Sequence, residues 1–161
     1  RYRWYGTSKF AERGVLEVKL KRNFSGWKVN FPISELESCG CENWRDIKNT
    51  ISRQLPPDGK VWMNQYPQPV LINRYQRKYF VSNEGKIRVT VDTNQQVFDQ
   101  RMSSFPNFKS GAHIAKNLVV EFKFDRLDRH TASDFIQSIP IRVSRNSKYI
   151  LGVHAIKLAT R

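Results

Sequence analysis

Apolar and polar side chains alternate with a period of two along much of this chain, which is the pattern of half-buried β-strands. In residues 14–22, for example, Leu16, Val18 and Leu20 alternate with polar and charged side chains. Residues 83–85, Asn-Glu-Gly, separate two such segments and predict a hairpin turn. The segments that we predict as strands are 1–5, 14–22, 26–33, 69–82, 85–93 and 117–125.

A hydrophobic stripe at helical spacing runs through residues 43–55 and predicts an amphipathic helix. The stripe consists of Trp44, Ile47, Ile51 and Leu55. The next stretch, 55–68, contains Pro56, Pro57 and Gly59. This composition favours a connecting loop.

Two more helices are predicted near the end of the chain. Thr131 and Asp134 form a capping-box pattern that opens a short helix over residues 132–138. Ser147 is a suitable N-cap for a last helix over residues 148–158. Strands followed by helices, with antiparallel hairpins, indicate an α+β fold.

Each predicted strand has one apolar face and one face rich in charge. An antiparallel sheet with one face in water explains this pattern. Such a sheet can also close into a barrel with the charge inside, which makes a hydrated tunnel. Periodicity leaves both arrangements open. The charged faces carry Arg1 and Arg3; Glu17, Lys19 and Lys21; Lys86, Arg88, Thr90 and Asp92; and Glu121, Lys123 and Asp125.

The net charge of +14, from 28 Lys and Arg against 14 Asp and Glu, indicates a polyanionic partner. The cations are spread along the chain, so we expect the fold itself to build the charged surface. Hydrophobic residues make up 39%, which suits a packed core and one domain over residues 1–161. No apolar run reaches the roughly 20 residues of a membrane helix.

The chain offers little sign of a Cys or His metal site. Cys39 and Cys41 have no partners at zinc spacing, so we expect reduced thiols. His113, His130 and His154 are scattered. Residue 1 lies inside a predicted strand with no initiator Met or signal-peptide pattern before it, and we expect a fragment of a longer protein.

Four segments, in this order, resemble the VTC (vacuolar transporter chaperone) domain of polyphosphate polymerases, within the triphosphate tunnel metalloenzyme superfamily. They are R-Y-R-W-Y-G at 1–6; L-E-V-K-L-K at 16–21; Y-Q-R-K-Y-F at 75–80 with I-R-V-T-V-D-T-N at 87–94; and V-V-E-F-K-F at 119–124 with S-K-Y-I-L-G at 147–152. The resemblance implies an antiparallel β-barrel whose charged lumen is a tunnel, with helices packed outside. It also implies that the N-terminal part of the barrel is missing from this chain.

The resemblance also implies a set of site residues. Glu121 matches the glutamate that helps to hold a divalent metal, Mn²⁺ or Mg²⁺, and Glu17 is a weaker second candidate. Asp92 is expected to be structural and to orient Arg88. Asn30 departs from the family pattern, because a basic residue is expected there. The cations that match catalytic positions are Arg1, Arg3, Lys19, Arg77, Arg88 and Lys148. Further phosphate-binding positions are matched by the cations Lys28 and Arg145 and by the hydroxyl residue Ser147.

The implied function is that of a polyphosphate polymerase, which transfers the γ-phosphate of ATP to a growing polyphosphate chain. The attacking phosphate oxygen is already ionised, so positioning and charge neutralisation suffice without a general base. We expect ATP and polyphosphate as partners, no specific nucleic acid, and no membrane segment here. Membrane or regulatory domains are expected elsewhere in the parent, which we place in the cytoplasm or at the cytoplasmic face of a membrane.

Three other functions remain open from the residues. Triphosphate hydrolysis in the same tunnel would use a carboxylate to orient water. A non-catalytic polyphosphate sensor would need only the cations. Nucleic-acid binding is supported by the net charge and by aromatic side chains such as Trp4 and Tyr5.

Overall fold

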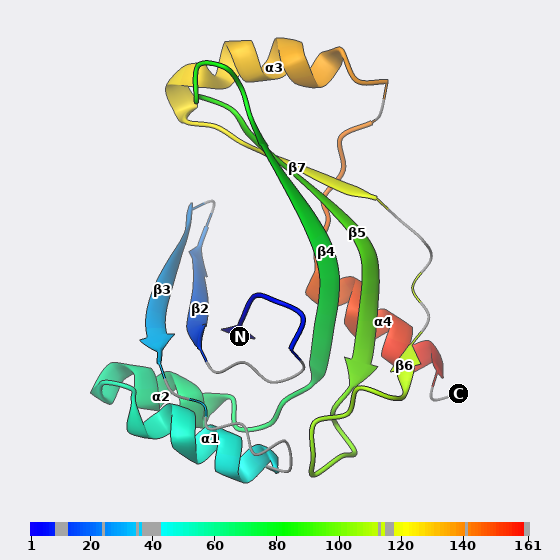
Figure 1. Cartoon of the computed structure of the whole chain (residues 1–161). Helices are drawn as coiled ribbons and strands as arrows, with labels where there is room; N and C mark the ends of the chain where they lie inside the picture. Colours follow the sequence, from blue (N-terminus) through cyan, green and yellow to red (C-terminus); the bar gives the residue numbers. More distant parts are fainter. Residues whose placement is uncertain are drawn as a thin grey trace. The chain divides into compact units, whose positions relative to one another are not determined.

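The computed structural model of this chain describes residues 1–8, 13–23, 25–34, 36, 43–112, 114, 118–140 and 142–159. The chain divides into two compact units, each with strands and helices (Figure 1). Unit 1 comprises Arg1–Val70 and Gln100–Phe108, and unit 2 comprises Leu71–Asp99 and Lys109–Arg161. The expectation of a single domain stays a prediction.

Unit 1 contains an antiparallel sheet in the order β1-β2-β3 and two helices. Its elements are β1 (Tyr2–Arg3), β2 (Gly14–Arg22), β3 (Ser25–Ile33), α1 (Trp44–Arg53) and α2 (Pro57–Gln65). The sheet buries its apolar face: Leu16 pairs with Phe31, and both belong to the core. The other buried members of that core are Ile33, Leu36, Ile51 and Leu55.

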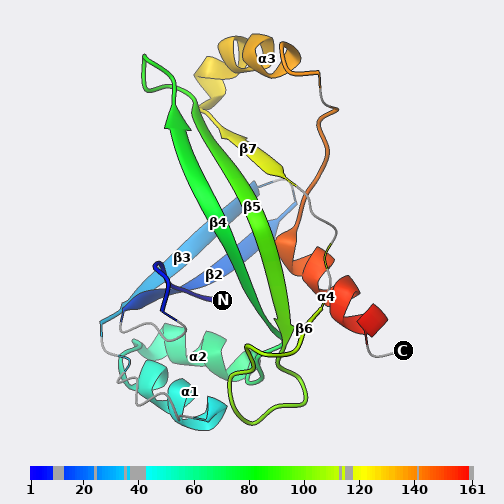
Figure 2. The same cartoon turned by 45° about the vertical axis from the view of Figure 1, so that its right-hand side comes forward.

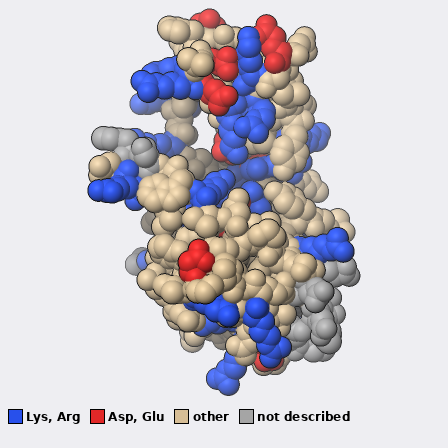
Figure 3. All heavy atoms as spheres, turned by 90° about the vertical axis from the view of Figure 1, so that its left-hand side faces the viewer, with Lys and Arg blue, Asp and Glu red and all other residues tan. Residues whose placement is uncertain are grey.

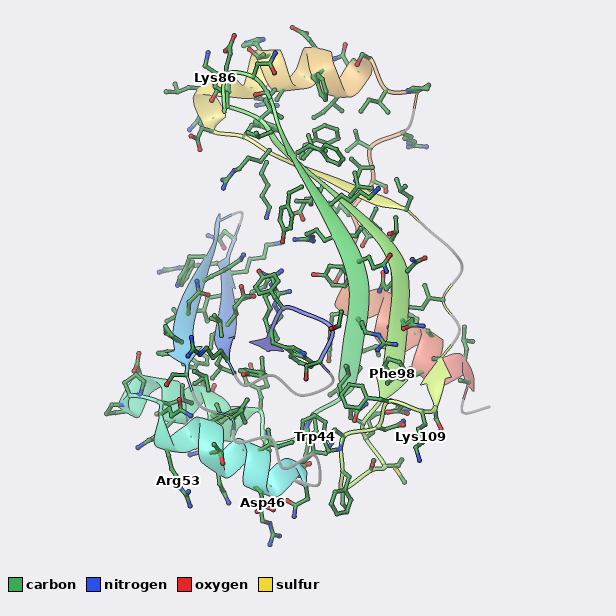
Figure 4. The ribbon with its side chains drawn as sticks, in the orientation of Figure 1. Trp44, Asp46, Arg53, Lys86, Phe98 and Lys109 are labelled. Carbon is green, nitrogen blue, oxygen red and sulfur yellow. The ribbon has the colours of Figure 1, made fainter. Side chains whose placement is uncertain are left out.

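The sequence stripe of α1 faces this core, since Ile51 is buried and Ile47 packs against the same cluster. The Asn43 side chain caps the helix by accepting a hydrogen bond of 2.9 Å from the Asp46 amide. Figure 4 shows Asp46 in the first turn and Arg53 in the last turn of α1. This order of charges suits the helix dipole.

Unit 2 is built on a long hairpin of β4 (Leu71–Val81) and β5 (Arg88–Asp99). β6 (Gly111–Ala112) pairs with β5 near Phe98, and β7 (Val119–Lys123) pairs with the other end of β5. Figure 2 shows β4 and β5 side by side, with β7 next to β5. The remaining elements are η1 (Arg126–Asp128), α3 (Arg129–Gln137) and α4 (Lys148–Ala159).

A β-bulge changes which residues of β5 share a face. Arg74 pairs with Gln96 and Gln76 pairs with Thr93, so two residues of β5 lie opposite one residue of β4. One of the two is Asn94, whose positive φ of 53° is tolerated by asparagine. Before the bulge, this face of β5 carries even-numbered residues such as Asp92. After the bulge, the same face carries odd-numbered residues such as Val97.

That face supports α4. A Cβ added to Gly152 would lie 3.0 Å from a methyl carbon of Leu71 and 3.3 Å from those of Val97. Glycine therefore lets α4 approach the sheet closely. Because Val97 and Asp92 lie on one face, α4 and the polar residues of the hairpin also share it.

Most of the predicted elements are confirmed. The strands lie within or close to their predicted ranges, although β5 extends to Asp99. The hairpin turn is confirmed by the positive φ of Gly85, 73°, and by its amide, which donates to the Ser82 carbonyl at 2.8 Å. The helix predicted over residues 43–55 is α1, and Ser147 begins α4 as predicted.

Two local predictions are wrong. Residues 55–68 contain the helix α2 as well as a loop. Pro57 fits the first turn of this helix, because a backbone N–H at that position would have no partner within the helix. Its Gly59 is buried against Leu55 and Phe31. The capping box is also wrong: α3 begins at Arg129, so Thr131 lies inside the helix.

The described residues contain two antiparallel sheets and no closed barrel. The α+β class is therefore confirmed, and the barrel with a charged lumen stays a prediction. Among the described helices, none has the length and apolar character needed to cross a membrane. Cys39, Cys41 and His113 lie outside the described residues.

Candidate functional site

One buried carboxylate on β5 holds two cations from different elements of unit 2. Asp92 is only 2% exposed. Arg77 of β4 donates to it with two nitrogens, Nε to Oδ1 at 2.5 Å and Nη2 to Oδ2 at 2.7 Å. Lys148, in the first turn of α4, places its Nζ 2.6 Å from the same Oδ2. Asp92 thus joins the hairpin to the start of α4.

The same two cations lie against one aromatic ring. The Arg77 guanidinium carbon is 5.2 Å from the centre of the Tyr75 ring, and the Lys148 Nζ is 5.1 Å from it. Arg77 also lies 5.9 Å from the Tyr79 ring. These are cation–π distances, so the rings stabilise the two cations next to the carboxylate.

The charges of this group are fixed by their neighbours. Burial alone would raise the pKa of the Asp92 carboxyl, but hydrogen bonds from Arg77 and Lys148 outweigh it and hold this pKa below its ordinary value. The hydrogen bond with Asp92 in turn raises the pKa of the Arg77 guanidinium. Both side chains are therefore charged at neutral pH.

β7 adds a more exposed carboxylate to the same face. Glu121 is paired in register with Thr90, two residues before Asp92, and its side chain is 45% exposed. One carboxylate oxygen lies 3.9 Å from Nη2 of Arg77, and the other lies 3.6 Å from Nζ of Lys123. Among the described residues, Glu121 makes only long ion pairs, and its exposed oxygens are accessible to a ligand.

Arg88 completes the cations of this face. It pairs in register with Lys123, is exposed, and has no ion pair or hydrogen bond of its side chain within the part of the chain that the structure describes. Because side chains of one parity share a face, Arg88 lies on the side of Glu121 and Arg77. An exposed arginine can offer its full fork of donors to phosphate oxygens.

The start of α4 contributes backbone donors. Ser147 caps the helix, with its Oγ accepting from the Ile150 amide at 3.4 Å. A helix N-terminus presents amide groups and a positive dipole end to an anion. Arg145, two residues before Ser147, is exposed and makes no hydrogen bond or ion pair among the described residues. Of the predicted residues, Arg77, Lys148 and Glu121 therefore lie together in unit 2. Arg88 lies on the same face of the sheet, and Ser147 stands at the start of α4.

The remaining predicted residues gather around Glu17 on the polar face of the unit 1 sheet. Glu17 is 6% exposed. Its carboxylate accepts from Arg1 Nε at 2.6 Å and from Arg3 Nη1 at 3.3 Å. Lys19 lies two residues further along β2 and pairs in register with Lys28 of β3. Arg1, Arg3, Lys19 and Lys28 therefore share one face, as the sequence predicts.

The electrostatics of Glu17 resemble those of Asp92. Burial would raise the pKa of this carboxyl, but the hydrogen bond from Arg1 and the positive charges of Arg1, Arg3 and Lys28 hold it below its ordinary value. The Glu17 carboxylate is thus neutralised by cationic side chains of its own unit. Asn30 pairs in register with Glu17 on this face. The family resemblance had implied a basic residue at this position.

The residues present fit a metal ion only together with phosphate. Within the described ranges there is no group of three or more His, Cys, Asp or Glu side chains that would hold a metal. Glu121 offers one accessible carboxylate, and the Thr90 hydroxyl opposite it is buried with no hydrogen-bond partner among the described residues. Oxygen ligands of this kind suit Mg²⁺ or Mn²⁺ when phosphate oxygens and waters complete the shell.

Sequence reasoning assigned Asp92 to the wrong arginine and missed Tyr75. Asp92 orients Arg77 and Lys148, because Arg77 is its direct cross-strand partner whereas Arg88 is four residues along the same strand. Tyr75 lies two residues before Arg77 in β4, so the two side chains share a face of the strand. This spacing was the feature of the sequence that could have identified Tyr75. Lys148 comes from a distant helix, so no local pattern indicates its contact with Asp92.

The fold mixes helices with antiparallel sheets, and each of the two units carries one cluster of cations around a buried carboxylate. The family model of the VTC domain matches residues 1–157, and the chain belongs to this family. Membership indicates a polyphosphate-related function. No curated protein and no solved structure matches the chain.

Proposed function

We propose that this domain is the phosphotransferase of a polyphosphate polymerase, which transfers the γ-phosphate of ATP to a growing polyphosphate chain. The observation that carries the proposal is the convergence in unit 2: Arg77, Lys148 and the exposed Arg88 share one face with the accessible Glu121. Family membership supports polyphosphate as the polyanion.

The arrangement suits phosphoryl transfer without a protein nucleophile. A terminal oxygen of the polymer bonds to the γ-phosphorus while the bond between that phosphorus and the β–γ bridging oxygen breaks, and ADP leaves with the electron pair. The attacking oxygen is ionised, so no proton has to be removed. Arg77, Arg88 and Lys148 would neutralise the phosphate oxygens and align the two chains of phosphate.

Glu121 is the residue that would hold a divalent cation, with the Thr90 hydroxyl beside it. A bound Mg²⁺ or Mn²⁺ supplies additional neutralisation of the phosphate charge. Arg77 and Lys123, at 3.9 and 3.6 Å, keep the Glu121 carboxylate oriented on this face. This carboxylate would then bind the cation, with phosphate oxygens and waters as its other ligands.

Several assignments extend the proposal. Arg1, Arg3, Lys19 and Lys28 would bind phosphates on the polar face of unit 1, and Arg145 and Ser147 would do so at the start of α4. ATP as the donor places the domain in the cytoplasm or at the cytoplasmic face of a membrane.

Polymer synthesis by the protein that carries this chain tests the proposal directly. The protein is incubated with ATP and Mn²⁺, and the products are separated on gels that resolve polyphosphate. We expect polymer ladders, a loss of rate of about 10²-fold or more in Arg88→Ala, the size typical for one transition-state donor, and loss of the metal dependence in Glu121→Gln. Lys78→Ala is the matched control, since Lys78 is exposed on the opposite face of β4.

Each alternative function gives a different result in this experiment. Free phosphate without ladders would identify a triphosphate hydrolase. Tight binding of added polyphosphate without turnover would identify a sensor. Equal synthesis by Arg88→Ala and Lys78→Ala would contradict the assignment of the site.

A further inference from the structure

Two like charges are held close to each other in unit 2. Arg77 and Lys148 lie 5.2 and 5.1 Å from the centre of the same Tyr75 ring and bond to the same carboxylate oxygen. Because both nitrogens lie within 2.7 Å of that oxygen, the two charges are close together, and their mutual repulsion is substantial when water is partly excluded. Their side chains are 13% and 19% exposed, so something in the fold must offset this cost.

We propose that Asp92 is a positioning residue that, with the Tyr75 ring, holds Arg77 and Lys148 as a preassembled two-cation clamp for phosphate. This inference rests on the proposed function in so far as phosphate is the ligand. It adds a role for Asp92 and Tyr75, to which the proposed function gives none. Asp92 is too deeply buried, at 2% exposure, to contact a substrate itself.

The hydrogen-bond geometry leaves donors available for a ligand. Asp92 takes two N–H groups of Arg77 and one N–H of Lys148. A guanidinium has five donors and an ammonium has three, so each cation keeps donors for phosphate oxygens. Two cations with one carboxylate also retain a net positive charge.

Preassembly lowers the cost of binding. A free Arg or Lys side chain loses rotamer freedom when it orders on a ligand, and that loss weakens affinity. Here folding has already ordered both side chains between the Asp92 carboxylate and the Tyr75 ring. The close contact of Gly152 with Leu71 and Val97 fixes α4 against the sheet, and with it the position of Lys148.

Replacement of Asp92 by Asn separates positioning from simple charge attraction. Asp92→Asn keeps the size of the side chain and adds one positive charge to the protein. A site that attracts phosphate only through net charge would bind tripolyphosphate more tightly after this change. A clamp that needs Asp92 would bind it more weakly, because two freed side chains must be ordered again.

Titration calorimetry with tripolyphosphate, without metal or ATP, is therefore the test. We expect Asp92→Asn to raise the dissociation constant about tenfold, the cost of ordering two long side chains. Asp125→Asn is the matched control: it changes the charge equally at an exposed position of unit 2 and should leave the affinity unchanged or slightly tighter. Tyr75→Leu, which changes no charge, should also weaken binding.

The readouts distinguish folding, positioning and function. A folding defect lowers the number of binding sites per protein, whereas loss of the clamp raises the dissociation constant at unchanged stoichiometry. Affinity of Asp92→Asn equal to or tighter than wild type would overturn the inference. Failure of the wild type to make polymer while these affinity changes hold would refute the polymerase alone, and absence of tripolyphosphate binding by the wild type would refute both.

Discussion

Asp92 in unit 2 and Glu17 in unit 1 are both acidic side chains that are almost inaccessible to water. Each is a buried carboxylate whose desolvation is offset by hydrogen bonds from two cationic side chains. Removal of one partner from such a group breaks a buried ion pair and leaves the carboxylate with a single cation, and breaking a buried pair typically costs about 3–5 kcal/mol. Arg77→Ala would therefore test folding as much as phosphate binding, and the exposed Arg88 is the better position for functional variants.

The pH dependence of Glu17 gives a prediction for unit 1. The pKa of Glu17 in the folded protein lies below its ordinary 4.5, so its ion pairs stabilise the fold above pH 4.5 and lose this effect as the pH falls through the folded pKa. We expect Glu17→Gln to lower the free energy of unfolding at pH 7 by about 1–3 kcal/mol and to have a much smaller effect near pH 3. Denaturant titrations followed by tryptophan fluorescence measure it, since Trp4, Trp27, Trp44 and Trp62 all lie in unit 1. The same destabilisation at both pH values would contradict a role for the Glu17 charge.

At the level of secondary structure, alternation predicted most strands, and in the sheet of unit 1 it does so because one face is buried and the other is polar. β2 is the clearest case, with Leu16 in the core and Lys19 on the polar face. Alternation could not predict the bulge at Asn94, since the insertion of one residue leaves no mark in a polar stretch. The helix α2 was missed because Pro57 usually indicates a break but is well tolerated in a first helical turn.

Gly14 determines how β1 docks on β2, and hence where Arg1 and Arg3 lie. A Cβ at this position would clash with the Tyr2 hydroxyl and would lie 2.7 Å from the backbone oxygen of Arg3. The backbone contact cannot be relieved by a side-chain rotation, so Gly14→Ala should destabilise unit 1 by about 1–3 kcal/mol.

The same tryptophan-monitored unfolding measures the effect of Gly14→Ala. Gly26→Ala is the matched control in β3, because its nearest contact for a Cβ is an ordinary 3.6 Å. If the two variants are equally stable, the close approach of β1 at Gly14 does not constrain the sheet.

At the level of the whole molecule, the charge of +14 predicted the class of partner but not how individual cations are used. Figure 3 shows Lys and Arg side chains on the viewed surface of both units. The motif resemblance selected cations that the structure places in two local clusters. It could not reveal that Asp92 bonds to Lys148, since that contact joins a strand to a helix more than fifty residues away.

Salt dependence separates specific phosphate binding from the general attraction of a cationic protein. Every phosphate contact that displaces counterions contributes to the slope of log affinity against log salt, and loss of one such contact reduces the slope by about one. We expect Arg88→Ala to weaken polyphosphate binding and to reduce this slope, whereas Lys78→Ala leaves both nearly unchanged.

Duplex DNA provides the comparison, because it would be attracted by the net charge over the whole surface. If Arg88→Ala and Lys78→Ala weaken DNA binding equally but differ on polyphosphate, the site on unit 2 recognises the polymer and the remaining charge only attracts it. Equal effects on both polyanions would mean that net charge alone accounts for binding, and that the convergence of Arg77, Arg88 and Lys148 has no special role.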